Sequence, residues 1–492
     1  MKAHHSLFGA LLALTPLYPA MAAEEITGPE ADSNEPVRVL PSDGSAPVIT
    51  SEFFNKLTVQ TGYGPENSEV GRSREMFYSL RYEPSFAWYS PEKRWAKWMV
   101  YGRLWLNYDS SQSISTQNEN SNSFDREQPE GWYAELRELY VKRNLLGDDP
   151  RFSLSVGRQR YFDDYGIWWD DSLESLRFNY NDTFSRGFFA VGQKFYNYNS
   201  DVNSLADSEE RTTYLMGEYA YRWSENNWAG VRLMHENDHS GHDPEDRDDF
   251  KGMRYGLFFK ADDLDVSPLF SDYHLELARL DGKVDSTDVA NNKVTTTGHT
   301  TRGWAVLGEI GKRFHDLPWS PRLALRGGLT DKPSNDNDGF RLNTIQSDRI
   351  TRQGSYSTRL ASSFVSLDLR NLSYYGFAVE TQPTPRSALD LRFTELKMRD
   401  ADGTVPIRVD GDQRSERNQA ILNNTYSGGK TIGQVYDLNY YWKMFPVAID
   451  GKHLDVNALV SASYLKAGSA LDTKTLDTGD DYQLTFGVVI SY

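Results

Sequence analysis

The last eleven residues of the chain alternate between an apolar and a polar face. From Tyr482 they read Tyr-Gln-Leu-Thr-Phe-Gly-Val-Val-Ile-Ser-Tyr, and the chain then stops. Successive side chains of a strand point to opposite faces, so the even-numbered residues form an apolar face. The odd-numbered ones are polar or glycine except Val489. A strand of this kind, ending on an aromatic residue, is typical of an outer-membrane β-barrel, with lipid on one side and a wet lumen on the other.

The same alternation recurs from residue 51 onward. In residues 76–88 the even positions include Tyr78, Phe86 and Trp88, whereas the odd positions include Arg81 and Glu83. Connectors alternate in length, which is typical of short turns on one rim and long loops on the other. The short connectors are 90–93, 147–150, 263–267 and 384–386. The long ones are 110–130, 238–249, 281–297, 331–356, 400–430 and 467–480.

We therefore predict an all-β fold, a transmembrane outer-membrane β-barrel of about 18 antiparallel strands over residues 51–492. The alternative is an array of soluble β-sandwiches, which would need a second buried face and would not explain the loop alternation. Aromatic residues make up 13% of the chain, and girdles at the two membrane interfaces would explain them.

The N-terminus predicts secretion to the outer membrane. Lys2 precedes an apolar run from Leu7 to Leu17, and Ala20-Met21-Ala22 supplies a cleavage signal, so residues 1–23 are predicted to be a signal peptide. The apolar run is too short to span a membrane. Residues 24–50 are polar and proline-rich, which predicts a periplasmic lead-in with little structure. A net charge of −17 argues against nucleic-acid binding, where a basic footprint is expected.

Whether a position is odd or even within its strand, which we call its parity, also predicts which charges face the lumen. The reason is that Arg or Lys on the lipid face at mid-membrane costs ~2–4 kcal/mol. The predicted inward cations are Lys56, Arg81, Arg103, Arg232, Arg254, Lys260, Arg326 and Arg370. The predicted inward acids are Glu83, Glu236, Glu309, Asp368 and Asp437, and Val365, Leu367 and Leu369 are expected to face lipid. Two interpretations remain open. One is the mixed polar lumen of an ordinary porin. The other is a cationic path on which arginines pair with the carboxylates of a passing polymer.

Two neighbouring segments resemble the alginate export porin family. Residues 132–141 read Trp-Tyr-Ala-Glu-Leu-Arg-Glu-Leu-Tyr-Val, and residues 154–160 read Leu-Ser-Val-Gly-Arg-Gln-Arg. In that family an A-x-x-R-E strand precedes a hairpin that carries G-R-Q-R. The likeness covers most of residues 53–492, with further matches at 168–170, 172–176, 192–195, 198–201, 235–242 and 432–434.

The resemblance implies an 18-stranded barrel for passive export of an anionic exopolysaccharide, most simply alginate, through an arginine-lined electropositive lumen. By position, the family's constriction corresponds to Lys56, Arg81, Arg137, Arg160, Arg349 and Arg359, and its acidic partners correspond to Asp170 and Asp201. The family's loop over the pore corresponds to residues 110–130, and its periplasmic plugging turn to residues 444–453. The chain departs from the family at Leu459, where a cation is expected, and at Asn197, where an acid is expected.

Two local patterns conflict with simple alternation. Arg158 and Arg160 share the parity of Leu154 and Val156, which would face lipid, so either Gly157 marks a bulge or the arginines lie beyond the membrane. Arg137 and Glu138 are adjacent, so both can face inward only with a similar irregularity.

The sequence offers no complete motif for a metal site or for a hydrolase. His235, His239 and His242 match no structural zinc motif, and residues 334–345 fit only part of a calcium-binding loop. No nucleophile elbow is present. The sequence therefore predicts a channel without cofactor or metal rather than an enzyme. The alternatives are an uptake porin for anionic oligosaccharides, with the same lumen, and an outer-membrane enzyme. The predicted partners are an anionic polysaccharide and outer-membrane lipid, with periplasmic export machinery as a further candidate.

Overall fold

The computed structural model describes most of the chain after residue 50. The described residues are 51–65, 76–91, 96–110, 131–146, 149–163, 167–200, 205, 211–239, 248–261, 269–290, 293–332, 338–340, 365, 369–401, 429–449, 452–470, 472 and 479–491. The predicted signal peptide and lead-in lie outside these residues. Within them, no helix is long and apolar enough to cross a membrane.

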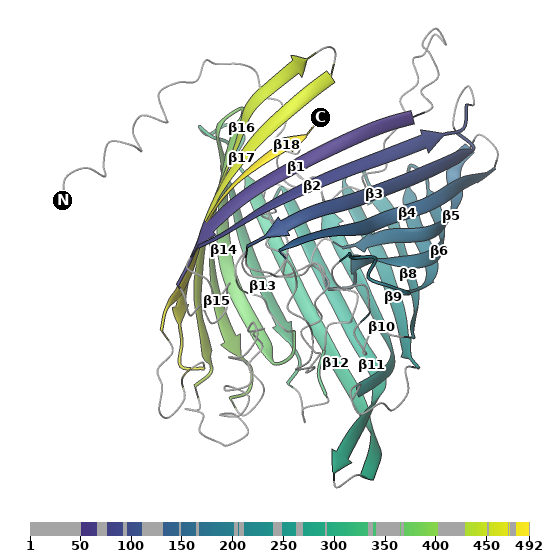
Figure 1. Ribbon diagram of the computed structural model, residues 1–492. Coiled ribbons are helices and arrows are strands. Elements are labelled where there is room, and N and C mark those ends of the chain that lie inside the picture. The colour runs from purple at the N-terminus through teal and green to yellow at the C-terminus, as the bar shows by residue number, and fades with distance from the viewer. Residues whose placement is uncertain are drawn as a thin grey trace.

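Eighteen strands form one closed antiparallel sheet, which confirms the predicted fold (Figure 1). Each strand pairs with its sequence neighbours, and β1 also pairs with β18, so the sheet has no free edge. The first nine strands are β1 (Ser51–Tyr63), β2 (Met76–Tyr89), β3 (Trp98–Asp109), β4 (Trp132–Leu146), β5 (Asp149–Phe162), β6 (Asp170–Asn181), β7 (Ser185–Gln193), β8 (Thr212–Ser224) and β9 (Asn227–Asp238). The others are β10 (Asp248–Ala261), β11 (Asp272–Ala290), β12 (Lys293–Arg313), β13 (Arg322–Thr330), β14 (Leu372–Thr384), β15 (Ser387–Met398), β16 (Thr431–Ile449), β17 (Lys452–Ala467) and β18 (Asp481–Ser491).

The two rims differ in the length of the segments that join the strands. β1 begins and β18 ends at the rim where short segments join β2 to β3, β4 to β5 and β6 to β7. Longer segments join β3 to β4, β13 to β14 and β15 to β16 at the other rim. Because outer-membrane barrels have short periplasmic turns and long extracellular loops, the short-turn rim faces the periplasm.

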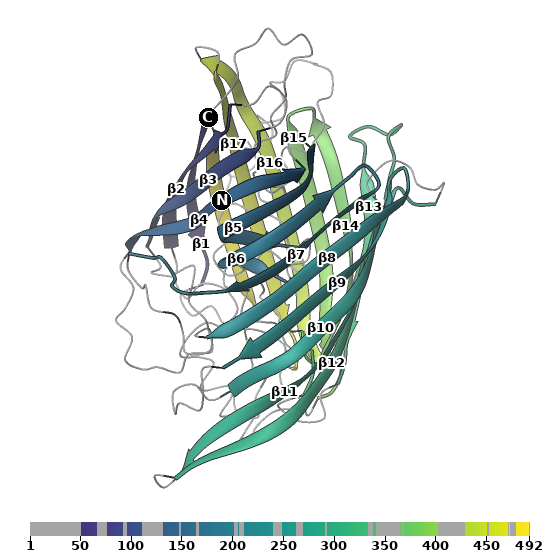
Figure 2. The ribbon, with the colours of Figure 1, turned by 90° about the vertical axis from the view of Figure 1, so that its right-hand side faces the viewer.

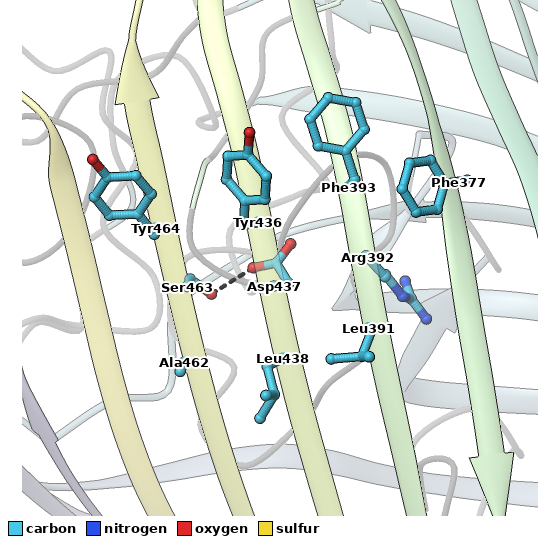
Figure 3. Close-up of a pocket in the computed structure, with 10 residues that line it drawn as sticks. All are labelled: Phe377, Leu391, Arg392, Phe393, Tyr436, Asp437, Leu438, Ala462, Ser463 and Tyr464. Atoms are coloured by element: carbon cyan, nitrogen blue, oxygen red, sulfur yellow. Dashed lines mark hydrogen bonds between the residues drawn. The ribbon is translucent and has the colours of Figure 1, made fainter.

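The outer face carries a row of aromatic side chains that starts near the middle of β14 and reaches the long-loop rim at β17 and β18. Phe377, Phe393, Tyr436, Tyr464 and Tyr482 are successive register partners on β14 to β18. Figure 3 shows the first four of these rings side by side. On the same strands, the residues next to Tyr464 and Tyr436 are joined by a hydrogen bond from the Ser463 hydroxyl to Asp437. The row continues onto β1 to β4 through contacts among Tyr63, Tyr78, Tyr108 and Trp132.

A second set of exposed aromatic residues lies near the short-turn rim. It contains Trp88, Trp98, Phe184, Trp223 and Trp319. Aromatic rings favour the two membrane interfaces, so the members of the two sets nearest the rims mark the boundaries of the lipid-facing band.

Three local expectations are wrong. Residues 281–297 are not a loop, because β11 and β12 continue as a hairpin to Ala290 and Lys293. This hairpin projects from the long-loop rim, as Figure 2 shows. Residues 365 and 369–370 lie outside the strands, and both Val365 and Leu369 are buried rather than lipid-facing. Strands also cover 444–449 and 452–453 of the expected plugging turn, and the β16–β17 ends project past the C-terminus in Figure 1.

A charge placed on the lipid-facing band should destabilise the barrel. Leu325 lies near the middle of β13 and is 66% exposed. We expect Leu325→Lys to lower the free energy of unfolding by about 2–4 kcal/mol, because lysine is costly near the bilayer midplane. Urea unfolding in liposomes measures the change. The control is Leu317→Lys in the connector between β12 and β13, which should change the free energy little; equal effects of the two variants would contradict the membrane placement.

Candidate functional site

The inner face of the described strands is a wall of ion pairs. Parity correctly placed Arg81, Arg103, Arg232, Arg254 and Arg326 on this face, where all are buried. The pairs include Arg103–Glu138 at 2.8 Å, Arg232–Glu276 at 2.8 Å, Arg254–Glu236 at 2.5 Å, Arg322–Glu309 at 2.7 Å and Arg392–Asp390 at 2.7 Å. The described wall is thus of mixed sign, because most of these guanidinium groups contact a carboxylate.

A bulge in β4 places Arg137 and Glu138 on the inner face together. The β3–β4 register passes from Arg103 with Glu138 directly to Leu104 with Leu136, so Arg137 has no register partner on β3. This extra residue is the irregularity that the sequence required. Arg137 is fully buried and contacts Glu135 at 2.6 Å and Asp171 at 3.3 Å.

Arg81 and Arg137 lie against the same indole ring. The Cζ atom of Arg81 is 3.9 Å from the centroid of Trp105, and that of Arg137 is 4.2 Å from it. We call these three residues the Arg–Trp–Arg cluster. Arg81 Nε also donates to Asn107 Oδ1 at 3.0 Å. Trp105 is 2% exposed, and its Nε1 has no hydrogen-bond acceptor among the described residues.

The other predicted site residues have varied environments. Lys56 is half-buried, and its Nζ lies 3.1 Å from Glu83 on β2. The Arg160 guanidinium lies 5.5 Å from the Phe162 ring, and its backbone N–H donates to Glu138 at 3.4 Å. Asp170 begins β6 opposite Phe162, and its side chain is not described. Asp201, Arg349 and Arg359 lie outside the described residues, as does the predicted loop after Ser110.

Asp171, rather than its neighbour Asp170, is the acid that the structure shows beside Arg137. Its other oxygen contacts Lys194 Nζ at 2.5 Å, and both side chains are buried. Sequence reasoning missed Asp171, Lys194 and Glu135. Counting the alternation back from Leu176 and Phe178, the apolar pair that faces lipid on β6, would have favoured Asp171 over Asp170.

Arg158 stays on the outer face of β5 but is covered. Its register partner on β4 is the exposed Leu139, so Gly157, at φ 132°, does not turn Arg158 into the lumen. Arg158 pairs with Glu174 at 2.9 Å, and its guanidinium lies 4.9 Å from the Tyr198 ring.

The cover is the segment 194–200, which follows β7. This segment reaches across β5 and β6 to hydrogen-bond with β4, from Leu136 N to Tyr198 O and from Ser200 N to Ala134 O. Phe195 N also donates to Glu174 at 2.9 Å. The segment therefore shields the Arg158–Glu174 ion pair from lipid on the outer face. This differs from both predicted explanations, a bulge at Gly157 and a position beyond the membrane.

The connector between β5 and β6 folds into the barrel. Asp163 accepts backbone N–H groups from Ile167, Trp168 and Trp169 at 2.8–3.0 Å. Burial raises the pKa of the Asp163 carboxyl, although these N–H groups and Arg232 oppose the rise. The connector belongs to a buried apolar cluster at the long-loop end of the lumen, together with Phe340 and Leu369.

Trp168 anchors this connector to strands on the far side. Its Nε1 donates to Glu276 on β11 at 2.6 Å. An added Cβ at Gly256 on β10 would lie 2.5 Å from the Trp168 ring, so glycine makes room for the indole. The connector thus narrows the lumen by bridging from β5–β6 to β10–β11.

A family model described as "Alginate export" matches residues 49–484. The chain belongs to the alginate export family. The family match and the barrel show an outer-membrane channel for alginate export, not an enzyme.

Individual relatives agree with this membership. The chain is 27% identical over 397 residues to the alginate production protein AlgE of Pseudomonas syringae pv. tomato, covering 74% of this chain and 77% of the relative. It is 29% identical over 155 residues to AlgE of Pseudomonas aeruginosa, covering 30% and 31% of the two chains. Among solved structures, Acinetobacter baumannii OccAB1 aligns with a TM-score of 0.50 at 11% identity, over 90% of this chain and 96% of that chain. This last likeness concerns the fold alone.

Releasing the β5–β6 connector should widen the pore. We expect Asp163→Ala to raise the single-channel conductance, because the variant loses an acceptor of three buried N–H groups, each costing about 1–3 kcal/mol when left unsatisfied. Planar-bilayer recording measures the conductance. The control is Asp182→Ala at the short-turn rim; unchanged conductance in Asp163→Ala would show that the connector does not limit the pore.

Proposed function

We propose that the Arg–Trp–Arg cluster is where the lumen recognises the carboxylates of the exported polyuronate. The observation that carries this proposal is the placement of two guanidinium groups against one buried indole. A cation over an aromatic face gains about 0.5–2 kcal/mol, so the indole holds both guanidinium groups in place before the polymer arrives. Arginine N–H donors match the two oxygens of a carboxylate, and they lie at the edge of the plane that stacks on the ring.

The surrounding ion pairs keep recognition weak. An exported polymer must bind well enough to enter and weakly enough to leave. Arg103, Arg232, Arg254 and Arg322 each contact a carboxylate of the wall, so a passing carboxylate competes with a resident one. We infer that few positions grip the polymer, while the rest of the wall supplies exchangeable polar contacts.

Transport through this lumen is passive. A conduit of fixed side chains lowers the barrier equally for both directions, so net export follows the concentration of polymer in the periplasm. Leu459 is buried on the inner face opposite Tyr441. The family has a cation at the position of Leu459, and recognition at the Arg–Trp–Arg cluster does not require one there.

We further propose the remaining predicted assignments. Residues 1–23 serve as the signal peptide, residues 24–50 as a periplasmic lead-in, and residues 51–492 as the barrel. Lipid of the outer membrane contacts the aromatic rows and the apolar band between them. Periplasmic export machinery, if it binds the barrel, meets the short-turn rim, where the polymer enters. Lys56, Arg349, Arg359 and Asp201 are proposed as further contacts along the path. Arg160 and Asp170 share the outer-face parity of Arg158 and Glu174 in the uninterrupted β5–β6 register, so they are not proposed as lumen contacts.

Removing one cation of the cluster should weaken polymer binding. We expect Arg81→Gln to raise the concentration of oligouronate that half-blocks the ion current by about 3- to 10-fold, the range expected for one lost hydrogen-bonded contact. Arg81 is the better target because Arg137 is fully buried among carboxylates, and removing one partner of such a group destabilises the fold. Planar-bilayer recording with oligouronate, and with a neutral glucan of equal length, measures the block.

The indole provides a second, independent variant. Trp105→Leu should reproduce part of the loss seen in Arg81→Gln, because both guanidinium groups lose their support without any change of charge. The control is Arg151→Gln, whose side chain is 52% exposed at the short-turn end of β5. Equal block by uronate and glucan, or no effect of either variant, would contradict the proposed recognition site.

A further inference from the structure

Arg177 is an inward-facing arginine that the proposed site does not include. It lies on β6, opposite the buried Ser155 on β5 and the buried Ala190 on β7. Its sequence neighbours Leu176 and Phe178 are exposed on the outer face. The alternation of the strand therefore directs Arg177 to the lumen.

Aromatic rings hold Arg177 instead of a carboxylate. Its Cζ atom lies 4.4 Å from the ring centroid of Phe188 and 5.2 Å from that of Tyr161. Within the described part of the chain, no Asp or Glu oxygen lies within 4.0 Å of its guanidinium group. Its Nε atom is buried and has no hydrogen-bond acceptor there.

This environment differs from that of the ion-pair wall. A partly buried cation loses hydration, and ring faces replace only part of it. At Arg232 or Arg392 a bound anion must displace a resident carboxylate, whereas at Arg177 it would add a missing counter-charge. An incoming carboxylate would therefore gain more at Arg177 than at an arginine of the ion-pair wall.

Arg177 also lies closer to the short-turn rim than the Arg–Trp–Arg cluster does. Its partner Ser155 is opposite Lys142 on β4, five residues nearer to that rim than Arg137. A polymer that enters from the periplasm meets Arg177 first.

We propose that Arg177, held against the adjacent rings of Tyr161 and Phe188, is an entry subsite for a carboxylate of the polyuronate on the periplasmic side of the constriction. The inference rests on the proposed function, because it assumes that the lumen recognises uronate carboxylates. It adds a second cation, reached earlier, and predicts that recognition differs between the two sides of the channel.

The test measures block by a short oligouronate added to either side of a single channel in a planar bilayer. We expect Arg177→Gln to raise the half-blocking concentration by about 3- to 10-fold from the short-turn side, as for one lost hydrogen-bonded contact, and by less than this from the long-loop side. Arg177→Lys should lie between wild type and Arg177→Gln, since lysine keeps the charge but not the planar group that stacks on the rings. If the glutamine variant fails to fold, the lysine variant alone tests the entry subsite.

The matched control is Arg143→Gln. Arg143 lies on β4 near the same rim, but its side chain is exposed on the outer face with its guanidinium 4.8 Å from the Trp98 ring. This variant removes the same charge without touching the lumen and should leave the block unchanged. An effect of Arg143→Gln equal to that of Arg177→Gln would overturn the proposal, because net charge would then explain both.

Arg81→Gln separates the two proposals. If Arg81→Gln weakens the block and Arg177→Gln does not from either side, the entry subsite is wrong and the cluster remains. If oligouronate does not block the wild-type channel at all, both proposals fail.

Discussion

Eight register pairs join β1 to β18, from Lys56 with Ser491 to Tyr63 with Leu484. Lipid offers no hydrogen-bond partners, so a sheet can cross a membrane only when such a seam removes its edges. The seam also fixes the facing of the whole wall, because a slip of one residue would exchange the inner and outer faces. The inward position of Thr58 and Gln60 beside the seam, and of Arg81 on the next strand, follows from this closure.

The cost of a charge in contact with lipid explains most of the other features. It sends Arg232, Arg254 and Arg322 to the lumen, where acids of neighbouring strands accompany them. It also explains the cover over Arg158 and Glu174, which stay on the outer face only because the segment 194–200 crosses over them. The bulge in β4 adds one more inward cation, Arg137, and brings it against the indole that also contacts Arg81.

Alternation was enough to predict the barrel, the lipid-facing residues of β18 and the inward facing of Arg81 and Arg326, because each depends on period and burial alone. Alternation failed where the structure depends on how far a hairpin projects or on contacts between residues distant in the sequence. Residues 281–297 were expected to form a loop because they are polar, but a hairpin that projects from the barrel has no lipid-facing side to reveal it. The contact of Trp105 with Arg81 and Arg137 depends on three strands and a bulge. The partner of Trp168 lies 108 residues away on β11, and no sequence pattern indicated either contact.

We expect this lumen to prefer uronate carboxylates to neutral sugars of the same size. The most direct measurement is release from liposomes that hold the channel and are loaded with an oligouronate and a neutral oligoglucan of equal length. The uronate should be released faster at low salt, and the difference should shrink as salt rises, because screening weakens the attraction. Equal release of both sugars at every salt concentration would contradict this preference.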